Sequence, residues 1–398
     1  MKAVALAAIL LAQSFGSDSH AQARVGVLSE PGTSVVAAEL LFSVGPGDED
    51  EYQSGLTYLA ARSVVAPIEP LLDSIGAHLN VLPEKDAISF SLVSAPDVWE
   101  EATGILSTAL FRDPPDSLTV IRERASIAAE LQGRSANPAD AATRAIDRAF
   151  FGPDHPWGRP TVGTPESVRR LQFGEVESFL RENFVSSRTF AAAVGPLDPA
   201  SATAHLESLL GSAQGAPLDY PPFEPAERSI QAAYNSITTW VTASFIFPED
   251  ADEEAMRFIG YLAAAELSFS PLQRSIYNVE SEVVTRVGSG EIRLQIVVPP
   301  EESEAWEERV AGVLTRLLDS PMLPDVYAGH LRRYAGEQLM ALAAPEDRAH
   351  AAARRLLVHG QVDGHIPGLE GLTQERVRQA AASLATPTIV VLGPTLDD

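Results

Sequence analysis

The sequence predicts an α+β fold made of two homologous halves, each with a mixed or antiparallel sheet and helices packed on one face. Two observations favour this fold. Segments of the first half recur in the second, and within each half the strands come in adjacent pairs while the helices come in runs. A doubly wound parallel sheet would alternate strands with helices instead. The chain has 398 residues and no cysteine, so its stability must come from buried cores.

The repeat consists of three ordered matches. The longest joins FSVGPGDEDEYQSGLTYLAA, residues 42–61, to FIFPEDADEEAMRFIGYLAA, residues 245–264. Both segments run from an apolar strand through an acidic turn into a helix. The other two matches keep the same order at nearly the same spacing, which indicates two homologous halves. They join residues 96–101 to 304–308, and residues 193–196 to 391–394.

The N-terminal segment and a stretch of biased composition define the remaining parts of the chain, a signal peptide and a linker. After Met1-Lys2 comes a short apolar run, residues 3–12, and a polar stretch then leads to Ala21-Gln22-Ala23, which together have the form of a secretory signal peptide. A retained or lipid-tethered helix is the alternative, although a lipid anchor of this kind needs a cysteine. A stretch rich in Pro, Ala and Gly predicts a linker. The expected parts are a signal peptide at 1–23, a first half at 24–212, a linker at 213–230 and a second half at 231–398.

Periodicity places the elements within each half. Runs of apolar and β-branched residues, or of alternating polarity, predict strands, and longer amphipathic runs predict helices. In the second half the expected strands are 237–247 and 292–298. In the first half the expected strands are 34–44 and 87–93, and the expected helices are 97–110, 117–132, 140–151 and 175–184.

The charge of the chain limits its partners. It has 54 Asp and Glu against 29 Lys and Arg, a formal net charge of −25. This balance argues against nucleic acid or an anionic membrane surface as a partner. No apolar run is long enough to span a bilayer. With the signal peptide, these features predict an exported protein.

Residues 55–62, GLTYLAAR, are the most informative segment. The surrounding sequence resembles the insulinase/pitrilysin-like family of zinc peptidases, which includes the mitochondrial processing peptidases. Active members read roughly G-L-a-H-L-x-E-H here, where the two His bind zinc and the Glu activates water. In this chain the corresponding residues are Tyr58, Ala61 and Arg62. The resemblance therefore implies a relative that lacks the catalytic machinery.

Other motifs extend the resemblance over nearly all of the chain after residue 23. It implies two similar halves that close like a clamshell around an extended peptide, and it favours a periplasmic location in a Gram-negative bacterium. The motifs are a strand pair at 76–80 with Asp86 and Phe90, an E-x6-E helix with Glu123 and Glu130, and an H-P-y-G segment at 155–158 followed by Gly163-Thr164.

The replacements at the motif remove each part of zinc chemistry. The phenol of Tyr58 must lose a proton with a pKa near ~10 before it can bind a metal. Arg62 stays protonated, and Ala61 leaves no general base. Of the aligned ligand positions, Glu130 alone could bind zinc. We therefore expect no catalytic residue, no metal and no cofactor, with zinc present only if distant residues rebuild a site.

The two acids of the E-x6-E helix have two interpretations. Glu123 and Glu130 lie two turns apart on one helix face, which is typical of a solvated acidic stripe. If Glu130 instead points toward the former zinc position, it is a buried carboxylate that needs a partner. Arg62 projects from the neighbouring helix, so we hypothesise that it pairs with Glu130. Tyr58 recurs as Tyr261 in the second half, so we expect it to be a packing residue.

The resemblance also implies a peptide-binding strand. An exposed sheet edge can bind an extended peptide through backbone hydrogen bonds. A simple hairpin around residues 83–86 is the alternative interpretation of the same segment. In active relatives an Arg and a Tyr seven residues apart hold the substrate backbone, but Tyr277 and Val284 occupy these positions. The expected peptide-binding residues are Leu79, Asn80 and Val81.

Three functions agree with these features. The first is a catalytically inactive subunit of a periplasmic heterodimeric peptidase, which pairs with a homologous zinc-containing subunit and helps to form a cleft for extended or unfolded peptides. The second is a stand-alone peptide-binding or scaffold protein. The third is an active zinc endopeptidase with atypical ligands. The sequence has no G-x-S-x-G elbow, no phosphate-binding loop of the G-x4-G-K-[ST] type and no Cys nucleophile.

Overall fold

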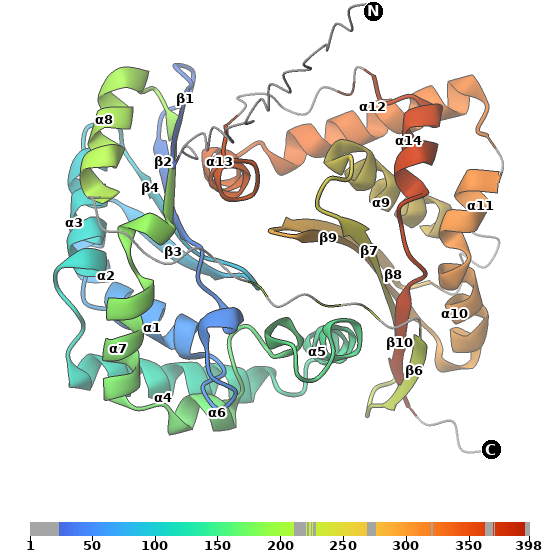
Figure 1. Cartoon of the computed structure of the whole chain (residues 1–398), viewed down its shortest axis with the longest axis horizontal. Helices are drawn as coiled ribbons and strands as arrows, with labels where there is room; N and C mark the ends of the chain where they lie inside the picture. Colours follow the sequence, from blue (N-terminus) through green and yellow to red (C-terminus); the bar gives the residue numbers. More distant parts are fainter. Residues whose placement is uncertain are drawn as a thin grey trace, which may run out of the picture.

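Two five-stranded sheets, one in each half, face each other across the molecule, and most helices lie on their outer sides (Figure 1). The computed structural model describes residues 24–210, 220, 223, 225, 228–268, 276–319, 321–362, 369 and 371–394. The predicted α+β fold of two similar halves is confirmed. The predicted signal peptide at 1–23 lies outside the described residues. Among the described helices, none is long and apolar enough to cross a bilayer.

The first sheet is mixed, with the strand order β1-β5-β2-β4-β3. The β1–β5 pair is parallel and the other three pairs are antiparallel. Every residue of β2 and β5 is buried, as expected for strands that are covered on both faces. The strands are β1 (Val25–Ser29), β2 (Val36–Phe42), β3 (His78–Pro83), β4 (Ile88–Ser94) and β5 (Thr189–Gly195).

The second sheet repeats the first, with the order β6-β10-β7-β9-β8 and a parallel β6–β10 pair. The repeat seen in the sequence is therefore also a repeat of topology. The predicted linker at 213–230 is too long at its C-terminal end, because residues 228–230 pair with β10. The strands are β6 (Arg228–Ala233), β7 (Thr239–Pro248), β8 (Asn278–Arg286), β9 (Ser289–Val298) and β10 (Thr388–Gly393).

The helices of the first half begin at recognisable caps. Asp116 accepts a hydrogen bond from the backbone of Thr119 at the start of α4, and Asn137 caps α5. The four helices predicted for this half correspond closely to α3, α4, α5 and α7. The helices are α1 (Leu56–Val65), α2 (Glu69–Ser74), α3 (Trp99–Phe111), α4 (Ser117–Arg134), α5 (Pro138–Phe151), α6 (Pro165–Arg170), α7 (Phe173–Asn183) and α8 (Pro199–Leu210).

The second half has its own core, which Trp306, Phe245 and Phe258 help to fill. Its long helix α9 begins after an acidic turn, as α1 does in the first half. The helices are α9 (Glu253–Ser268), α10 (Ser303–Ala311), α11 (Val313–Asp319), α12 (Pro324–Ala341), α13 (Pro345–His359) and α14 (Gln374–Ala381).

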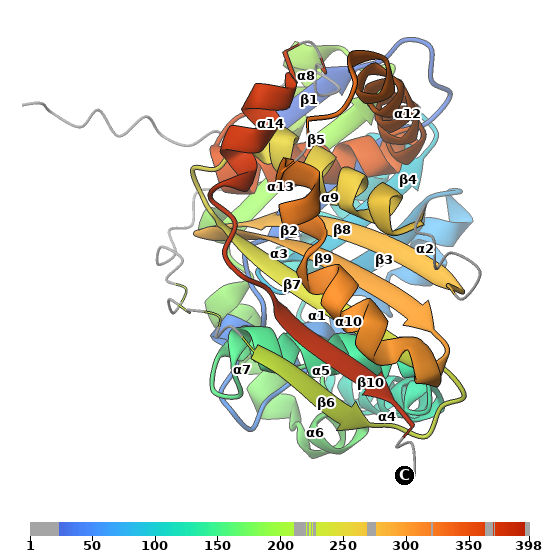
Figure 2. The same ribbon diagram turned by 90° about the vertical axis from the view of Figure 1, so that its right-hand side faces the viewer.

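Each half also covers the sheet of the other half with one helix (Figures 1 and 2). Helix α13 packs against β2 and β5 of the first sheet, and α5 packs against β7 and β10 of the second. The apolar faces of both helices are rich in alanine, which allows close approach to a sheet. The faces consist of Ala349, Ala352, Ala353 and Leu356 on α13 and of Ala141, Ala142, Ile146 and Ala149 on α5. The inner face of each sheet, on which no helix was predicted, is thus also covered.

Candidate functional site

Helix α1 corresponds to the zinc-binding helix of the family that the sequence resembles, and two residues fix its start. Gly55 precedes the helix with φ 94°, a left-handed conformation that favours glycine. A side chain there would collide, because a Cβ atom would lie 2.8 Å from the carbonyl oxygen of Val162. The buried carboxylate of Glu49 accepts hydrogen bonds from the backbone N–H groups of Gly55 (3.1 Å) and Thr57 (2.8 Å). These contacts fix the position of the helix.

An ion pair lies at the motif positions. Arg62 Nη2 is 3.1 Å from Glu123 Oε2 of α4, and the two side chains are 28% and 14% exposed. Arg62 Nη1 also donates a longer hydrogen bond, 3.5 Å, to the Tyr58 hydroxyl. Burial alone would lower the pKa of Arg62, but the hydrogen bond to Tyr58 and the charge of Glu123 raise it. Arg62 is therefore a fixed cation between α1 and α4.

The hypothesis that Arg62 pairs with Glu130 is wrong. The Glu130 side chain is 47% exposed, and its neighbour is Arg134 on the same helix, 3.9 Å away. Seven residues move a side chain about 10 Å along a helix axis, so Glu123 and Glu130 cannot both reach Arg62. Glu130 therefore matches the simpler interpretation of a solvated acid.

The other motif positions carry no metal ligands. Ala61 is fully buried, and Tyr58 packs against the core of the first half in addition to its contact with Arg62. In the described part of the chain, no group of three or more His, Cys, Asp or Glu side chains is arranged to hold a metal ion. His155, from the H-P-y-G segment, is buried and accepts a hydrogen bond from the backbone of Trp157.

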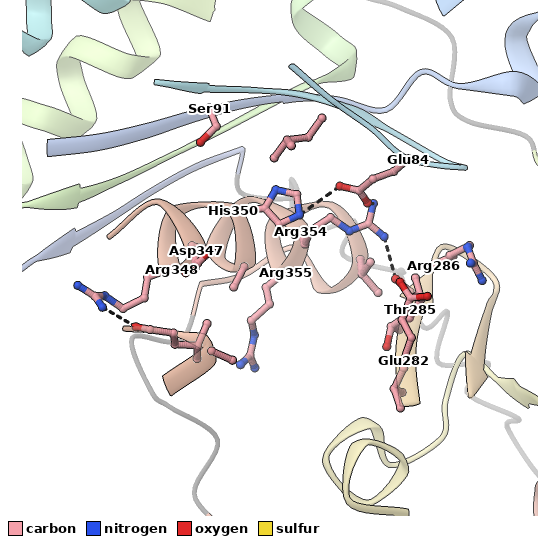
Figure 3. A pocket seen from close by; sticks show the side chains of 18 of the residues that line it. Glu84, Ser91, Glu282, Thr285, Arg286, Asp347, Arg348, His350, Arg354 and Arg355 are labelled. Atoms are coloured by element: carbon pink, nitrogen blue, oxygen red, sulfur yellow. Dashed lines mark hydrogen bonds and ion pairs between the residues drawn. The ribbon is translucent and has the colours of Figure 1, made fainter. Parts of the chain in front are cut away.

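A cavity of about 1520 Å³ lies between the two halves (Figure 3). Its walls include β3 and the β3–β4 turn from the first half, and β8 and α13 from the second half. Pockets for small ligands usually measure about 300–1,000 Å³. The cavity is large enough to hold several residues of an extended chain.

The predicted peptide-binding residues lie on β3, which is an edge strand. Among the described strands, β3 pairs with β4 alone, so its other edge presents free backbone groups. Asn80 is exposed and lines the cavity, whereas Leu79 is buried in the core and Val81 is half-buried. β3 and β4 also form the hairpin of the alternative interpretation, and the two interpretations are compatible because the hairpin uses the opposite edge.

The second sheet offers an equivalent edge to the same cavity. β8 pairs with β9 on one side, and residues 282–286 of β8 line the cavity. Val284 is among them, while Tyr277 lies exposed just before the strand. The Arg and Tyr that the family resemblance places seven residues apart are thus replaced by Tyr277 and Val284.

Charged side chains line the cavity, and many of them are paired with one another. Sequence reasoning did not identify this network, because its partners lie far apart in the chain. One sequence signal was available: Lys85 is the only lysine other than Lys2. The pairs are Arg354 with Glu84 and Asp86, His350 with Glu84, Lys85 with Asp147, Arg348 with Glu30, and Glu253 with Arg257 and His359.

Comparisons of sequence give short matches. No family model matches the chain. An uncharacterized zinc protease of Mycobacterium leprae is 27% identical over 145 residues, which cover 36% of this chain and 32% of that protein. One from Mycobacterium bovis is 26% identical over 151 residues, covering 38% of this chain and 34% of that protein. The matched segment thus spans about a third of the length of these curated relatives.

Comparisons of structure cover nearly the whole chain. A peptidase M16 inactive domain from Pseudomonas fluorescens has a TM-score of 0.78 at 19% identity, and the match covers 94% of this chain and 96% of that chain. A protease from Helicobacter pylori has a TM-score of 0.79 at 14% identity, and this match covers 94% and 97%. At these identities the structures establish the fold.

The fold matches that of these peptidase-like structures and the sequence matches are to proteins named zinc proteases, which confirms the predicted resemblance to the insulinase/pitrilysin-like family. In this chain Tyr58, Ala61 and Arg62 stand where that resemblance places the H-x-x-E-H residues.

Proposed function

We propose that this protein is a non-catalytic, peptidase-like subunit that works with a homologous zinc-containing subunit and helps to hold extended peptides. The ion pair of Arg62 with Glu123 carries this proposal. A fixed cation at a ligand position repels a divalent ion, and Ala61 leaves no carboxylate to activate water. The names of the relatives support the two roles: those from Mycobacterium are called zinc proteases, and the domain from Pseudomonas fluorescens is called inactive.

The cavity supports the role in peptide binding. It exposes two sheet edges, β3 and β8, to which an extended chain can add by backbone hydrogen bonds. Because many of its charges are already paired, we expect binding to depend little on the charge of the peptide and little on salt.

The proposal also includes export to the periplasm. The signal-like N-terminus and the acidic, cysteine-free composition support this location. Fractionation of the native host should recover the protein in the periplasm without residues 1–23.

Metal analysis and a peptidase assay test the absence of catalysis. The purified full chain should contain no stoichiometric zinc and should not cleave casein, with or without a chelator. A zinc-containing homologue from the same host should bind this chain in equal amounts and gain peptidase activity from it. Tightly held zinc in the isolated chain, with proteolysis that a chelator abolishes, would overturn the proposal.

A stand-alone peptide-binding protein is the second candidate, and one observation favours it. The cavity and both free edges lie within a single chain, so a partner is not needed to form a binding site. Fluorescence anisotropy with labelled, unfolded casein peptides separates the two candidates. Tight binding by the isolated chain, unchanged by any homologue, favours the stand-alone role.

A further inference from the structure

The turn between β3 and β4 connects the two halves through its charged side chains. We call residues 84–86 the central turn. Arg354 of α13 donates hydrogen bonds to Asp86 Oδ1 (2.8 Å) and Oδ2 (3.1 Å), and it lies 3.0 Å from Glu84 Oε2. It also donates to the carbonyl oxygen of Thr285 on β8, at 2.8 Å. One guanidinium of the second half thus holds both acids of the central turn and an edge strand of its own sheet. Figure 3 shows Arg354 beside Glu84 and Thr285.

The middle residue of the central turn extends the network in another direction. Lys85 Nζ lies 2.8 Å from Asp147 Oδ2 of α5, and Asp147 Oδ1 lies 2.7 Å from Arg293 of β9. Arg293 also pairs with the buried Glu291 at 2.7 Å. The chain of charges therefore runs from a turn of the first half, through the helix that covers the second sheet, into the second sheet itself.

A third connection lies on α13. His350 Nδ1 is 2.8 Å from the fully buried carboxylate of Glu39 in the middle of β2, and its Nε2 is 3.2 Å from Glu84. Arg348 pairs with Glu30 at 2.6 Å, in the loop that follows β1. Helix α13 is therefore attached to the first half by ion pairs at three of its positions, in addition to its apolar face.

If the two halves moved apart and opened the cavity, these contacts would have to break at the same time. Any rotation of one half away from the other must peel α13 from the first sheet or α5 from the second, because each helix belongs to one half and packs on the other. The same movement would separate the buried Asp86 from Arg354 and the buried Asp147 from Arg293.

We propose that the central turn, α5 and α13 lock the two halves into one rigid body, so that the cavity keeps a fixed width whether or not a peptide is bound. This inference does not depend on the proposed function. It implies that the two halves of this chain do not open and close on a peptide.

Distance measurements between spin labels test the rigid body. The chain contains no cysteine, so Leu71→Cys on α2 and Val326→Cys on α12 introduce the only two labelling sites, both at exposed positions in different halves. Double electron–electron resonance should give one narrow distance distribution. It should not change when unfolded casein peptides are added. A broad or two-peaked distribution in the labelled parent overturns the proposal.

Variants of the residues that pair across the two halves around the central turn complete the test. In the labelled chain, Arg354→Gln should replace the single narrow distance distribution with a broader or two-peaked one. Arg134→Gln is the matched control, because it breaks an exposed ion pair with Asp140 inside the first half and should leave the distance unchanged. If Arg354→Gln does not fold by circular dichroism, Asp147→Asn replaces it, because it breaks the ion pair with Arg293 that joins the two halves. A folded network variant with a distribution as narrow as that of the parent also overturns the proposal.

Discussion

Arg62 connects two helices that a zinc ion would join in an active relative. Its guanidinium meets Glu123 from α4 while its stem stays on α1, so a cation of the chain itself joins the two helices. An exposed ion pair stabilises little, but this pair is mostly buried and a lone carboxylate would be costly there.

Two alanine variants of α4 measure the contribution of this ion pair. Glu123→Ala should lower the free energy of unfolding by about 1–2 kcal/mol, because it leaves the half-buried Arg62 without its carboxylate. Glu130→Ala is the matched control on the same helix and should change it by less than about 0.5 kcal/mol. Urea unfolding monitored by circular dichroism gives both values. Equal losses in the two variants would contradict the assignment of Glu123 as the partner.

His350 gives the stability of the protein a predictable pH dependence. Burial lowers the pKa of its imidazole, but hydrogen bonds to Glu39 and Glu84 outweigh burial and raise the pKa to about 10 from the ordinary 6.5. A raised histidine pKa stabilises the folded state fully below pH 6.5, and this stabilisation is lost as the pH rises toward 10. The free energy of unfolding should therefore fall over this window.

A histidine variant isolates this contribution. His350→Gln should flatten the dependence of the unfolding free energy on pH between 6.5 and 10. His205→Gln is a suitable control, since burial lowers the pKa of His205 below 6.5 and so away from the window. The same slope in the parent and in His350→Gln would refute the assignment. Chemical unfolding at a series of pH values provides the measurement.

The sequence predicts residue identities at the site better than their contacts. The replacement of motif residues by Tyr58, Ala61 and Arg62 can be read directly. The sequence does not tell whether Arg62 meets Glu123 or Glu130, because both acids lie on one helix face. The choice depends on where α1 crosses α4. That crossing is set by the packing of the whole core around Leu59 and Val64, which no local pattern encodes.

At the scale of elements, α1 shows how a loop residue positions a helix. The Glu49 carboxylate lies seven residues before the helix, yet it satisfies two backbone N–H groups at its N-terminus. Burial raises the pKa of Glu49, while the hydrogen bonds from Thr57 and Gly55 oppose this shift. The carboxylate thus replaces the usual N-cap side chain, which Gly55 cannot supply.

Removal of this cap should destabilise the first half. Glu49→Ala leaves two buried N–H groups without an acceptor and should cost about 2 kcal/mol in the free energy of unfolding. The neighbouring exposed acid gives the control: Glu51→Ala should stay within about 0.5 kcal/mol of the parent. Thermal and urea unfolding of both variants checks the expectation, and a Glu49→Ala variant as stable as the parent would contradict it.

Strands and helices with strong local patterns are predictable, and elements defined by partners are not. The four predicted helices and the central strands β2, β4, β7 and β9 lie close to their expected positions, because their hydrophobic periodicity is clear. Residues 228–230 of β6 were assigned to the linker and no strand was predicted over Arg228 to Ala233, which becomes a strand through pairing with β10. Tertiary contacts decide such segments.

At the scale of the whole molecule, the internal repeat predicted the number of sheets and their equivalence. It did not predict which helices would cross over, because α5 and α13 look like ordinary amphipathic helices of their own halves. The charged network could not be predicted either, because its partners lie far apart in the sequence: Asp86 and Arg354 are 268 positions apart. Only the assembled fold brings them together.

The crossing helices make the two halves depend on each other for folding. Residues 24–227 produced alone would expose the inner face of the first sheet, and residues 228–398 alone would expose that of the second. We expect each fragment to aggregate when expressed singly, and the two to form a soluble one-to-one complex when co-expressed, as size-exclusion chromatography with light scattering would reveal. A soluble, monomeric single fragment would refute this dependence.

The same exchange constrains how such a molecule could arise. A single ancestral unit with this packing would have had one sheet face without a covering helix and one helix without a sheet to pack on. Two identical copies that exchanged these helices would have buried both surfaces. Gene duplication and fusion would then have tethered an existing homodimer, after which Arg354 and Asp147, at corresponding places on α13 and α5, could acquire opposite charges.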